Sequence, residues 1–279
     1  GEIVRKFHEE IKAKHLVRPT NIFLVGSSGV TAPVESKPDA VKEAQTVLSK
    51  AMLEASGLKM DFIDVKREAE LSIKGMIPAR YKDESVLVDI GSGNTKGGFV
   101  DGDKLVTFGV PFGTTLLATK VAGMSGPLAE KMEDARKTQL LPALKKELAN
   151  GAFGKKNHVY LSGGILYATA TLTDFGKKKP YHPMTLEQVL QLESRILKDP
   201  TAFPTPDLSG IRDEEAKKAV LKEVENVKKI YKPDQLLAGV EILKTVLTEL
   251  DVQKEKKSLF WVREGQIGWI SAYVAEKVK

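Results

Sequence analysis

A run of short strands and turns near the middle of the chain constrains its fold more than any other feature. Ser85 to Ile90 reads as a strand, Gly91 to Asn94 as a tight turn and Thr95 to Val100 as a second strand. A turn at Asp101-Gly102-Asp103 then leads into a third strand over Lys104 to Val110. The pattern predicts a three-stranded hairpin sheet whose first turn is rich in glycine.

Helices and further strands are expected on both sides of this hairpin sheet. Apolar spacing and capping signals predict helices over residues 2–15, 38–56, 67–76, 114–123, 126–149, 165–174, 185–197, 212–230 and 234–250, with a last one beginning near Glu264. Short apolar runs predict strands over residues 21–25, 60–65, 158–162 and 258–262, and the lysine- and proline-rich stretch 176–183 is expected to be a loop. Strands followed by helices indicate a mixed α/β fold.

The length of the chain predicts two lobes. A chain of 279 residues exceeds the usual size of a single hydrophobic core. We expect a hinge near Pro78 to Glu84, with an N-terminal lobe over residues 1–80 and a C-terminal lobe over residues 81–279. The C-terminal lobe then holds the hairpin sheet, and its last helix is a candidate to pack back on the first lobe.

Composition excludes several classes of function. The absence of cysteine excludes disulfides, thiolate metal sites and a cysteine nucleophile, and it fits the cytoplasm. No stretch approaches the roughly 18 unbroken apolar residues of a membrane span, and no RGG tract or zinc finger indicates nucleic acid. We therefore expect neither a membrane nor a nucleic acid as a partner, and we leave open whether the chain forms a homodimer. Because the chain begins with Gly1 and not with methionine, a preceding targeting segment also stays open.

The glycine-rich turn has the composition of an anion-binding loop. Gly91 and Gly93 let consecutive backbone N–H groups approach one anion, and Ser92, Asn94 and Thr95 can add side-chain donors. Asp89, at the end of the preceding strand, stands where a carboxylate can hold Mg²⁺ through water. The alternative is an ordinary hairpin turn rich in glycine, and from this motif alone the two are about equally favoured.

Two more segments place glycine beside the start of a helix. The strand 158–162 ends in Gly163-Gly164, which offers a second anion-binding helix end. Phe108 to Thr115 ends the hairpin sheet at another helix start. For each segment alone, close packing or helix capping is the better explanation of its glycines. The segments indicate a binding site only through their order along the chain.

That order resembles the exopolyphosphatase/guanosine pentaphosphate phosphatase (Ppx/GppA) family. The resemblance covers the chain from about residue 15 to its end and is partial residue by residue. Its motifs are Val25-Gly26-Ser27-Ser28-Gly29-Val30-Thr31, Glu68-Ala69-Glu70-Leu71 with Gly75, Val88 to Lys96, Val110-Pro111-Phe112-Gly113-Thr114, Leu161-Ser162-Gly163-Gly164, Lys232 to Leu243 and Arg263-Glu264-Gly265.

The resemblance implies a two-lobed fold of the actin/sugar-kinase/Hsp70 type, with mixed sheets, that hydrolyses phosphoanhydrides between its lobes. The family's catalytic glutamate, which orients the attacking water, falls on Glu68, with Glu70 as a fallback. Phosphate contacts are implied at Ser28, in the 91–95 loop and at Gly163-Gly164, with Mg²⁺ at Asp89. The alternative for Glu68 is a solvated carboxylate at the start of a helix.

Four departures from the family pattern bear on activity. No D-x-G-S-N-S hairpin, the family's other phosphate jaw, precedes Phe23, so the first lobe is expected to be incomplete. Thr31 stands where the family has a phosphate-contacting arginine. Lys96 replaces the usual glutamate, and Ile165 the usual threonine. Each charged contact to a phosphoryl group contributes about 1.5–3 kcal/mol, so these losses weaken the case for catalysis.

Three hypotheses follow from the sequence. The leading one is a Mg²⁺-assisted hydrolase that removes terminal phosphate from inorganic polyphosphate or a guanosine polyphosphate, with Glu68 orienting water. The second is a catalytically degenerate sensor of the same fold that binds phosphate or nucleotide. The third, an actin-like or sugar-kinase-like ATPase, is disfavoured because the chain shows no adenosine-loop signature and no catalytic aspartate beyond Asp89.

Overall fold

A six-stranded mixed sheet forms the centre of the larger part of the molecule. The computed structural model describes residues 1–30, 38–149, 152–176 and 178–278. The strands of this sheet are β3 (Ser85–Ile90), β4 (Thr95–Asp101), β5 (Lys104–Val110), β6 (His158–Ser162), β7 (Tyr181–Met184) and β8 (Ser258–Val262). They lie in the order β5-β4-β3-β6-β8-β7, with β3, β6 and β8 parallel and the other pairs antiparallel. The predicted three-stranded hairpin sheet is confirmed as one half of it.

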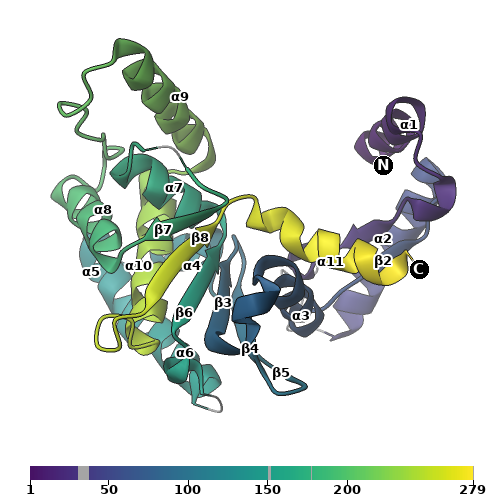
Figure 1. Ribbon diagram of the computed structural model, residues 1–279, viewed down its shortest axis with the longest axis horizontal. Helices are drawn as coiled ribbons and strands as arrows, with labels where there is room; N and C mark the ends of the chain where they lie inside the picture. The colour runs from purple at the N-terminus through teal and green to yellow at the C-terminus, as the bar shows by residue number, and fades with distance from the viewer. Residues whose placement is uncertain (31–37, 150–151, 177, 279) are drawn as a thin grey trace.

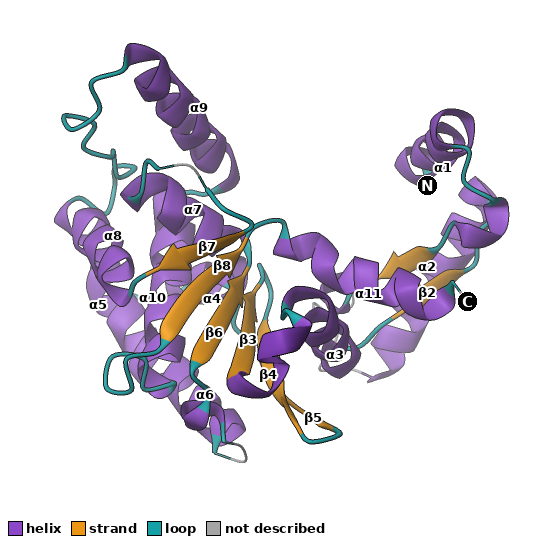
Figure 2. Cartoon of the chain, in the orientation of Figure 1, coloured by secondary structure: helices purple, strands orange, loops and turns teal. Residues whose placement is uncertain are grey.

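Helices from residues 114–249 cover one face of this sheet (Figure 2). They are α4 (Thr114–Ala122), α5 (Leu128–Ala135), α6 (Leu141–Leu148), α7 (Gly164–Thr173), α8 (Leu186–Lys198), α9 (Glu214–Ile230) and α10 (Pro233–Glu249). Helix α10 lies at the centre of this layer and is apolar nearly all round, because it packs against α4, α7 and α8 as well as the sheet. Val88 and Ile90 of β3 point into the resulting core.

The opposite face of the sheet is covered near the hairpin by α3 (Val65–Met76). Ile73 and Met76 pack on Leu87 and Val100, which are buried side chains of β3 and β4. Because successive side chains of a strand point to opposite faces, Leu87 faces α3 while its neighbours Val86 and Val88 face the helical layer. Strand β3 is thus buried on both sides, which holds its carboxyl end in place.

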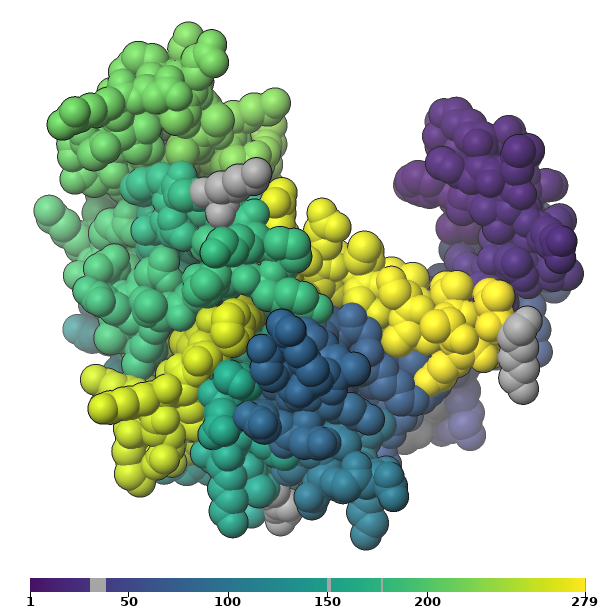
Figure 3. Space-filling model, in the orientation of Figure 1, coloured from purple at the N-terminus to yellow at the C-terminus, as the bar shows by residue number. Residues whose placement is uncertain are grey.

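The N-terminal part of the chain forms a smaller unit beside the sheet (Figure 1). It consists of α1 (Glu2–His15), α2 (Pro38–Ser56) and a two-stranded parallel sheet of β1 (Leu24–Gly26) and β2 (Met60–Phe62). Both strands are shorter than predicted, and the second gives way to α3 at Val65. In the space-filling view a wide opening separates this unit from α9 (Figure 3).

The C-terminal helix α11 (Gly268–Lys277) joins the two parts by packing along α3. The crossing is close because glycine meets glycine: a Cβ on Gly75 would lie 2.6 Å from the carbonyl carbon of Gly268. Lys74 Nζ also pairs with Glu276 Oε1 at 2.7 Å. This crossing explains why a glycine is required at position 75. The division of the chain into lobes at residue 80 stays a prediction.

One local prediction was wrong. The stretch 176–183 was expected to be a loop, but residues 181–184 form β7 at the edge of the sheet, where Pro183 is tolerated. The helix predicted over 126–149 is continuous but has a π-helical stretch, Arg136–Leu140, between α5 and α6. Among the described residues no helix combines the length and the apolarity needed to cross a membrane.

Candidate phosphate-binding site

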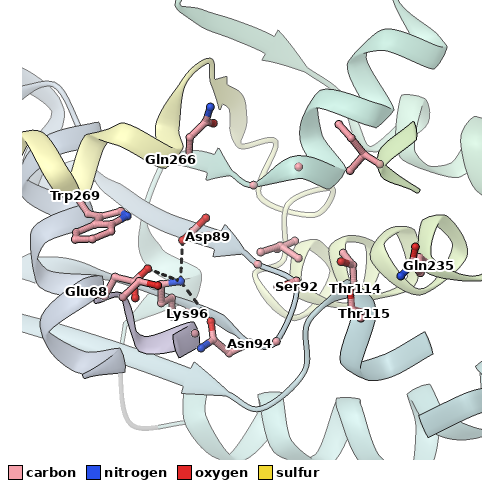
Figure 4. Close-up of a pocket in the computed structure, with 18 of the residues that line it drawn as sticks. Glu68, Asp89, Ser92, Asn94, Lys96, Thr114, Thr115, Gln235, Gln266 and Trp269 are labelled. Atoms are coloured by element: carbon pink, nitrogen blue, oxygen red, sulfur yellow. Dashed lines mark hydrogen bonds and ion pairs between the residues drawn. The ribbon is translucent and has the colours of Figure 1, made fainter. Parts of the chain in front are cut away.

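A cavity of about 510 Å³ opens where the carboxyl ends of β3 and β6 meet α3, α4, α7 and α11. Ligands of open α/β sheets bind at such strand ends. The cavity is lined by Ser27, Gly29, Glu68, Asp89, Ile90, Gly91, Ser92, Gly93, Asn94, Lys96, Thr114, Thr115, Gly163, Gly164, Ile230, Tyr231, Gln235, Gln266 and Trp269. The structure therefore brings together Glu68, Asp89 with the 91–94 turn, and Gly163-Gly164, which come from three separate segments of the sequence. Figure 4 shows Glu68, Asp89, Ser92 and Asn94 around this space.

The 91–94 turn is anchored by the first turn of α4. The carbonyl oxygen of Gly91 accepts a hydrogen bond from the Thr114 amide at 3.0 Å. That of Ser92 accepts from the Thr115 amide at 3.0 Å and the Leu116 amide at 3.1 Å. The free amides of this helix end thus bind carbonyls of the turn, and the Phe108 to Thr115 segment fixes the turn in place.

This anchoring determines where the amides of the turn point. In a planar trans peptide the C=O of one residue and the N–H of the next point in opposite directions. Since the carbonyls of Gly91 and Ser92 point at α4, the N–H groups of Ser92 and Gly93 point away from it. Neither amide has a protein acceptor in the part of the chain that the structure describes. Two adjacent free amides on a cavity wall form an anion-binding concavity.

Gly113 permits the close approach that this anchoring needs. A Cβ at this position would lie 2.5 Å from the Gly93 nitrogen, too close for any side chain. Its backbone is extended, with φ −127°, so space and not conformation requires glycine here. The glycine of the Val110 to Thr114 motif thus lets α4 support the turn.

The second glycine pair packs against the end of β3. Gly163 has φ 118°, and a Cβ there would lie 2.9 Å from the carbonyl carbon of Ile90. Gly164 starts α7, whose first amides lack acceptors within the helix. The Tyr231 hydroxyl lies beside Gly164, and burial raises the pKa of Tyr231 to about 12, so the hydroxyl keeps its proton at neutral pH. This wall of the cavity therefore also presents hydrogen-bond donors.

A buried ion cluster forms the opposite wall. The Nζ atom of Lys96 lies 2.9 Å from Asp89 Oδ2, 3.1 Å from Glu68 Oε1 and 3.3 Å from Asn94 Oδ1 (Figure 4). The side chains of Lys96, Glu68 and Asp89 are only 5%, 6% and 13% exposed. Burial works to lower the pKa of Lys96, but attraction to Asp89 and Glu68 outweighs it and the pKa is raised. Lys96 is therefore a permanent cation here.

Glu68 is positioned by the start of α3. Asp64 caps this helix by accepting a hydrogen bond from the Arg67 amide at 2.7 Å, and one turn later Glu68 lies on the buried side. Its Oε2 accepts from the Ser28 amide at 2.8 Å, so both of its oxygens have partners. Glu70 lies on another side of α3 and pairs with Arg67. Glu68 is thus a held carboxylate on the cavity wall, and the alternative of a solvated one is wrong.

The donor set does not fit a directly bound Mg²⁺. Among the described residues no group of three or more His, Cys, Asp or Glu side chains is placed to hold a metal ion. Mg²⁺ prefers oxygen ligands at about 2.0–2.1 Å, whereas Asp89 already shares Oδ2 with the Lys96 ammonium. The magnesium site at Asp89 stays a prediction that this geometry does not favour.

Some predicted contacts lie outside the cavity. The Thr95 hydroxyl is buried and donates to the carbonyl oxygen of Phe112 at 2.7 Å. Ser28 is buried too, and its hydroxyl accepts from Asn94 Nδ2 at 3.3 Å, so it supports the turn. The Thr31 position lies outside the described residues.

Other residues of the cavity wall were not named as site residues from the sequence. They are Thr114, Thr115, Tyr231, Gln235, Gln266 and Trp269. Thr114 is the last residue of the Val110 to Thr114 motif and Thr115 follows it directly, so the motif could have indicated both. Trp269 is buried in a small cluster with Ile63, Leu71 and Tyr273, and it also lines the cavity.

Comparisons with known proteins identify the fold. No protein-family model and no curated protein matches the sequence. Solved structures that match most of it include three exopolyphosphatase or Ppx/GppA proteins. They are an exopolyphosphatase-like protein with a TM-score of 0.66 and 15% identity, the type II variant of the Aquifex aeolicus Ppx/GppA phosphatase with 0.61 and 16%, and a Cytophaga hutchinsonii exopolyphosphatase with 0.60 and 15%.

The matches cover 95%, 99% and 98% of this chain and 81%, 81% and 80% of those chains, respectively. At identities this low the likeness establishes the fold, and it confirms the expected fold class. The chain thus has the two-lobed, mixed α/β fold of the exopolyphosphatase and Ppx/GppA proteins, as its ordered motifs predicted.

Proposed function

We propose that this chain is a phosphohydrolase that removes terminal phosphate from inorganic polyphosphate or a guanosine polyphosphate. The observation that carries the proposal is the pair of free amides at Ser92 and Gly93, on the wall of a cavity that also holds Glu68. The fold shared with exopolyphosphatases supports this substrate class. A cavity of about 510 Å³ also has the size of ordinary small-molecule sites, which span roughly 300–1,000 Å³.

In this reaction the protein mainly positions groups and stabilises charge. The amides of Ser92 and Gly93 hold oxygens of the terminal phosphoryl group, and the first turn of α7 faces the same space. A carboxylate offers about four lone pairs, so Glu68 can accept a hydrogen bond from water in addition to those from Ser28 and Lys96. Water attacks phosphorus and gives a proton to Glu68, the bridging P–O bond breaks, and the shortened chain leaves as its phosphate anion; Glu68 then releases the proton to solvent.

The test compares two neighbouring glutamates of α3. Phosphate release from polyphosphate and from guanosine pentaphosphate is measured for wild type, Glu68→Gln and Glu70→Gln. Loss of a positioned base typically lowers rates by roughly 10²–10⁴-fold, so we expect this loss for Glu68→Gln. Glu70 pairs with Arg67 away from the cavity, so its variant should keep the wild-type rate. Equal rates in both variants, or no release by wild type, would refute the proposal.

A second candidate is a phosphate or nucleotide sensor without turnover. It is favoured by the Lys96 and Ser28 contacts, because they occupy both oxygens of Glu68 and hold its carboxylate back from acting as a base. Calorimetric titration with inorganic phosphate and tripolyphosphate distinguishes the two functions. Saturable binding without phosphate release would establish the sensor.

Cofactor, partners and compartment stay predictions. The resemblance implies Mg²⁺, but the described carboxylates of the cavity are paired with Lys96, so no step of the reaction above depends on the ion. We still expect a cytoplasmic location and neither a nucleic-acid nor a membrane partner. Whether the chain forms a homodimer stays open.

A further inference from the structure

The buried ion cluster places one ammonium group where three side-chain oxygens converge. Lys96 Nζ contacts oxygens of Asp89, Glu68 and Asn94, at 2.9, 3.1 and 3.3 Å. An ammonium has three donors and no acceptor, so these contacts use its full capacity. Lys96 therefore has no donor left for a ligand in the cavity, and its role is to neutralise and hold the two carboxylates.

We propose that Lys96 is a built-in cation that takes the place of a divalent metal ion, so that this site binds phosphate without a metal. The claim that the site excludes a metal ion is argued from the ion cluster. The claim that the site binds phosphate rests on the proposed function.

Charge balance supports the substitution. Lys96, Asp89 and Glu68 together carry a single negative charge. A glutamate at position 96, the residue typical of the resembling family, would give three negative charges, and one divalent ion would restore the single one. A glutamate together with a divalent ion has a net charge of +1, and a single lysine has the same charge. Lys96 can therefore replace both of them without changing the charge of the site.

Geometry also excludes a metal ion from the same place. Mg²⁺ needs oxygens at about 2.0–2.1 Å, and the space between Asp89 Oδ2 and Glu68 Oε1 is filled by the Lys96 ammonium. A divalent ion at ~4 Å from that ammonium would meet a repulsion of several kcal/mol at the effective dielectric of a protein site. In the described residues no third acidic or histidine side chain is present to offset it.

The test measures metal binding directly. Mn²⁺ is titrated calorimetrically into wild type, Lys96→Glu and the matched control Lys104→Glu, which makes the same charge change at an exposed position of β5. We expect one Mn²⁺ site in Lys96→Glu, at least about tenfold tighter than any binding to wild type or Lys104→Glu, because affinity rises with the number of charged ligands. Adding Asp89→Asn to Lys96→Glu should weaken that site.

A thermal readout covers the risk that Lys96→Glu folds poorly. Mn²⁺ should raise the unfolding midpoint of Lys96→Glu and leave that of wild type unchanged, because a ligand stabilises only the state that binds it. If Lys96→Glu does not fold even with Mn²⁺, wild type and Asp89→Asn decide the question. A saturable Mn²⁺ site in wild type that Asp89→Asn abolishes would overturn the proposal, and its absence supports it.

The phosphate arm uses inorganic phosphate as the probe. Wild type should bind it equally well in EDTA and in Mn²⁺, and a tenfold or greater weakening in EDTA would contradict a metal-free site. If wild type binds no phosphate in either condition, the claim that the site binds phosphate and the proposed function are both refuted. The Mn²⁺ titration would still decide whether Lys96 replaces a metal ion.

Discussion

Replacing Lys96 by methionine should destabilise this protein strongly. The side chain is 5% exposed and is the cation that pairs with Asp89 and Glu68, at 2.9 and 3.1 Å. Methionine keeps the length and removes the charge, so two carboxylates are left close together in a site that excludes most water. Breaking a buried ion pair by removing one partner costs about 3–5 kcal/mol. That is a large share of the roughly 5–15 kcal/mol by which a typical domain is stable.

Urea denaturation at pH 7 measures this loss. The matched control is Lys104→Met, because Lys104 is an exposed lysine in the same hairpin sheet. We expect the control to lie within about 0.5 kcal/mol of wild type, as for most surface substitutions. The free energy of unfolding of Lys96→Met should fall by about 3–5 kcal/mol in the same assay.

A double variant tests whether unpaired charge is the cause. Lys96→Met/Asp89→Asn should be more stable than Lys96→Met alone, because asparagine removes one of the two uncompensated charges. A loss below about 1 kcal/mol for Lys96→Met, or no recovery in the double variant, would refute the reasoning, since buried uncompensated charge costs several kcal/mol.

Two further predictions concern the turn and the helical layer. Gly113→Ala places a Cβ 2.5 Å from the Gly93 nitrogen. Because overpacking costs roughly 1–3 kcal/mol, this variant should bind inorganic phosphate at least about tenfold more weakly in a calorimetric titration. In the control Gly123→Ala the nearest atom to the new Cβ, the carbonyl oxygen of Lys120, lies at 3.5 Å, so the affinity should not change. Burial, with a hydrogen bond to Glu193, raises the pKa of Glu241 to about 7. The folded state then binds a proton that the unfolded state releases, so this carboxyl lowers stability as pH rises from about 5 to 7. Urea titrations at these pH values should show the decline in wild type and less of it in Glu241→Gln.

Local sequence patterns predicted most of the helices and the hairpin sheet. Residues 233–249 and 258–262 form a helix and a strand close to where apolar spacing placed them, because both elements are set by short-range periodicity. The edge strand β7 was missed because Pro183 and the lysines that precede the strand in the sequence have the composition of a loop. It becomes a strand only through pairing with β8, nearly eighty residues later.

The site could be predicted as a set of motifs but not as a network of contacts. Gly91, Gly93, Glu68 and Asp89 reach one cavity, as their order along the chain suggested. The role of Lys96 was not predicted, because its partner Glu68 lies on α3, which only tertiary packing brings against β4.

The direction of side chains was the second unpredictable part. Thr95 was expected to contact phosphate, yet its hydroxyl points to the backbone of Phe112. Successive residues of a strand face opposite sides, so the first residue after a turn can point either way until the register is known.

The claim that the amides of Ser92 and Gly93 hold a phosphate is tested most directly by an NMR titration. Inorganic phosphate is added to ¹⁵N-labelled wild type and to Gly113→Ala, and the backbone amide resonances are followed. The account predicts a saturable downfield shift of the Ser92 and Gly93 amide protons in wild type, which Gly113→Ala weakens or abolishes. Unchanged Ser92 and Gly93 amides at phosphate concentrations that saturate other resonances would contradict it.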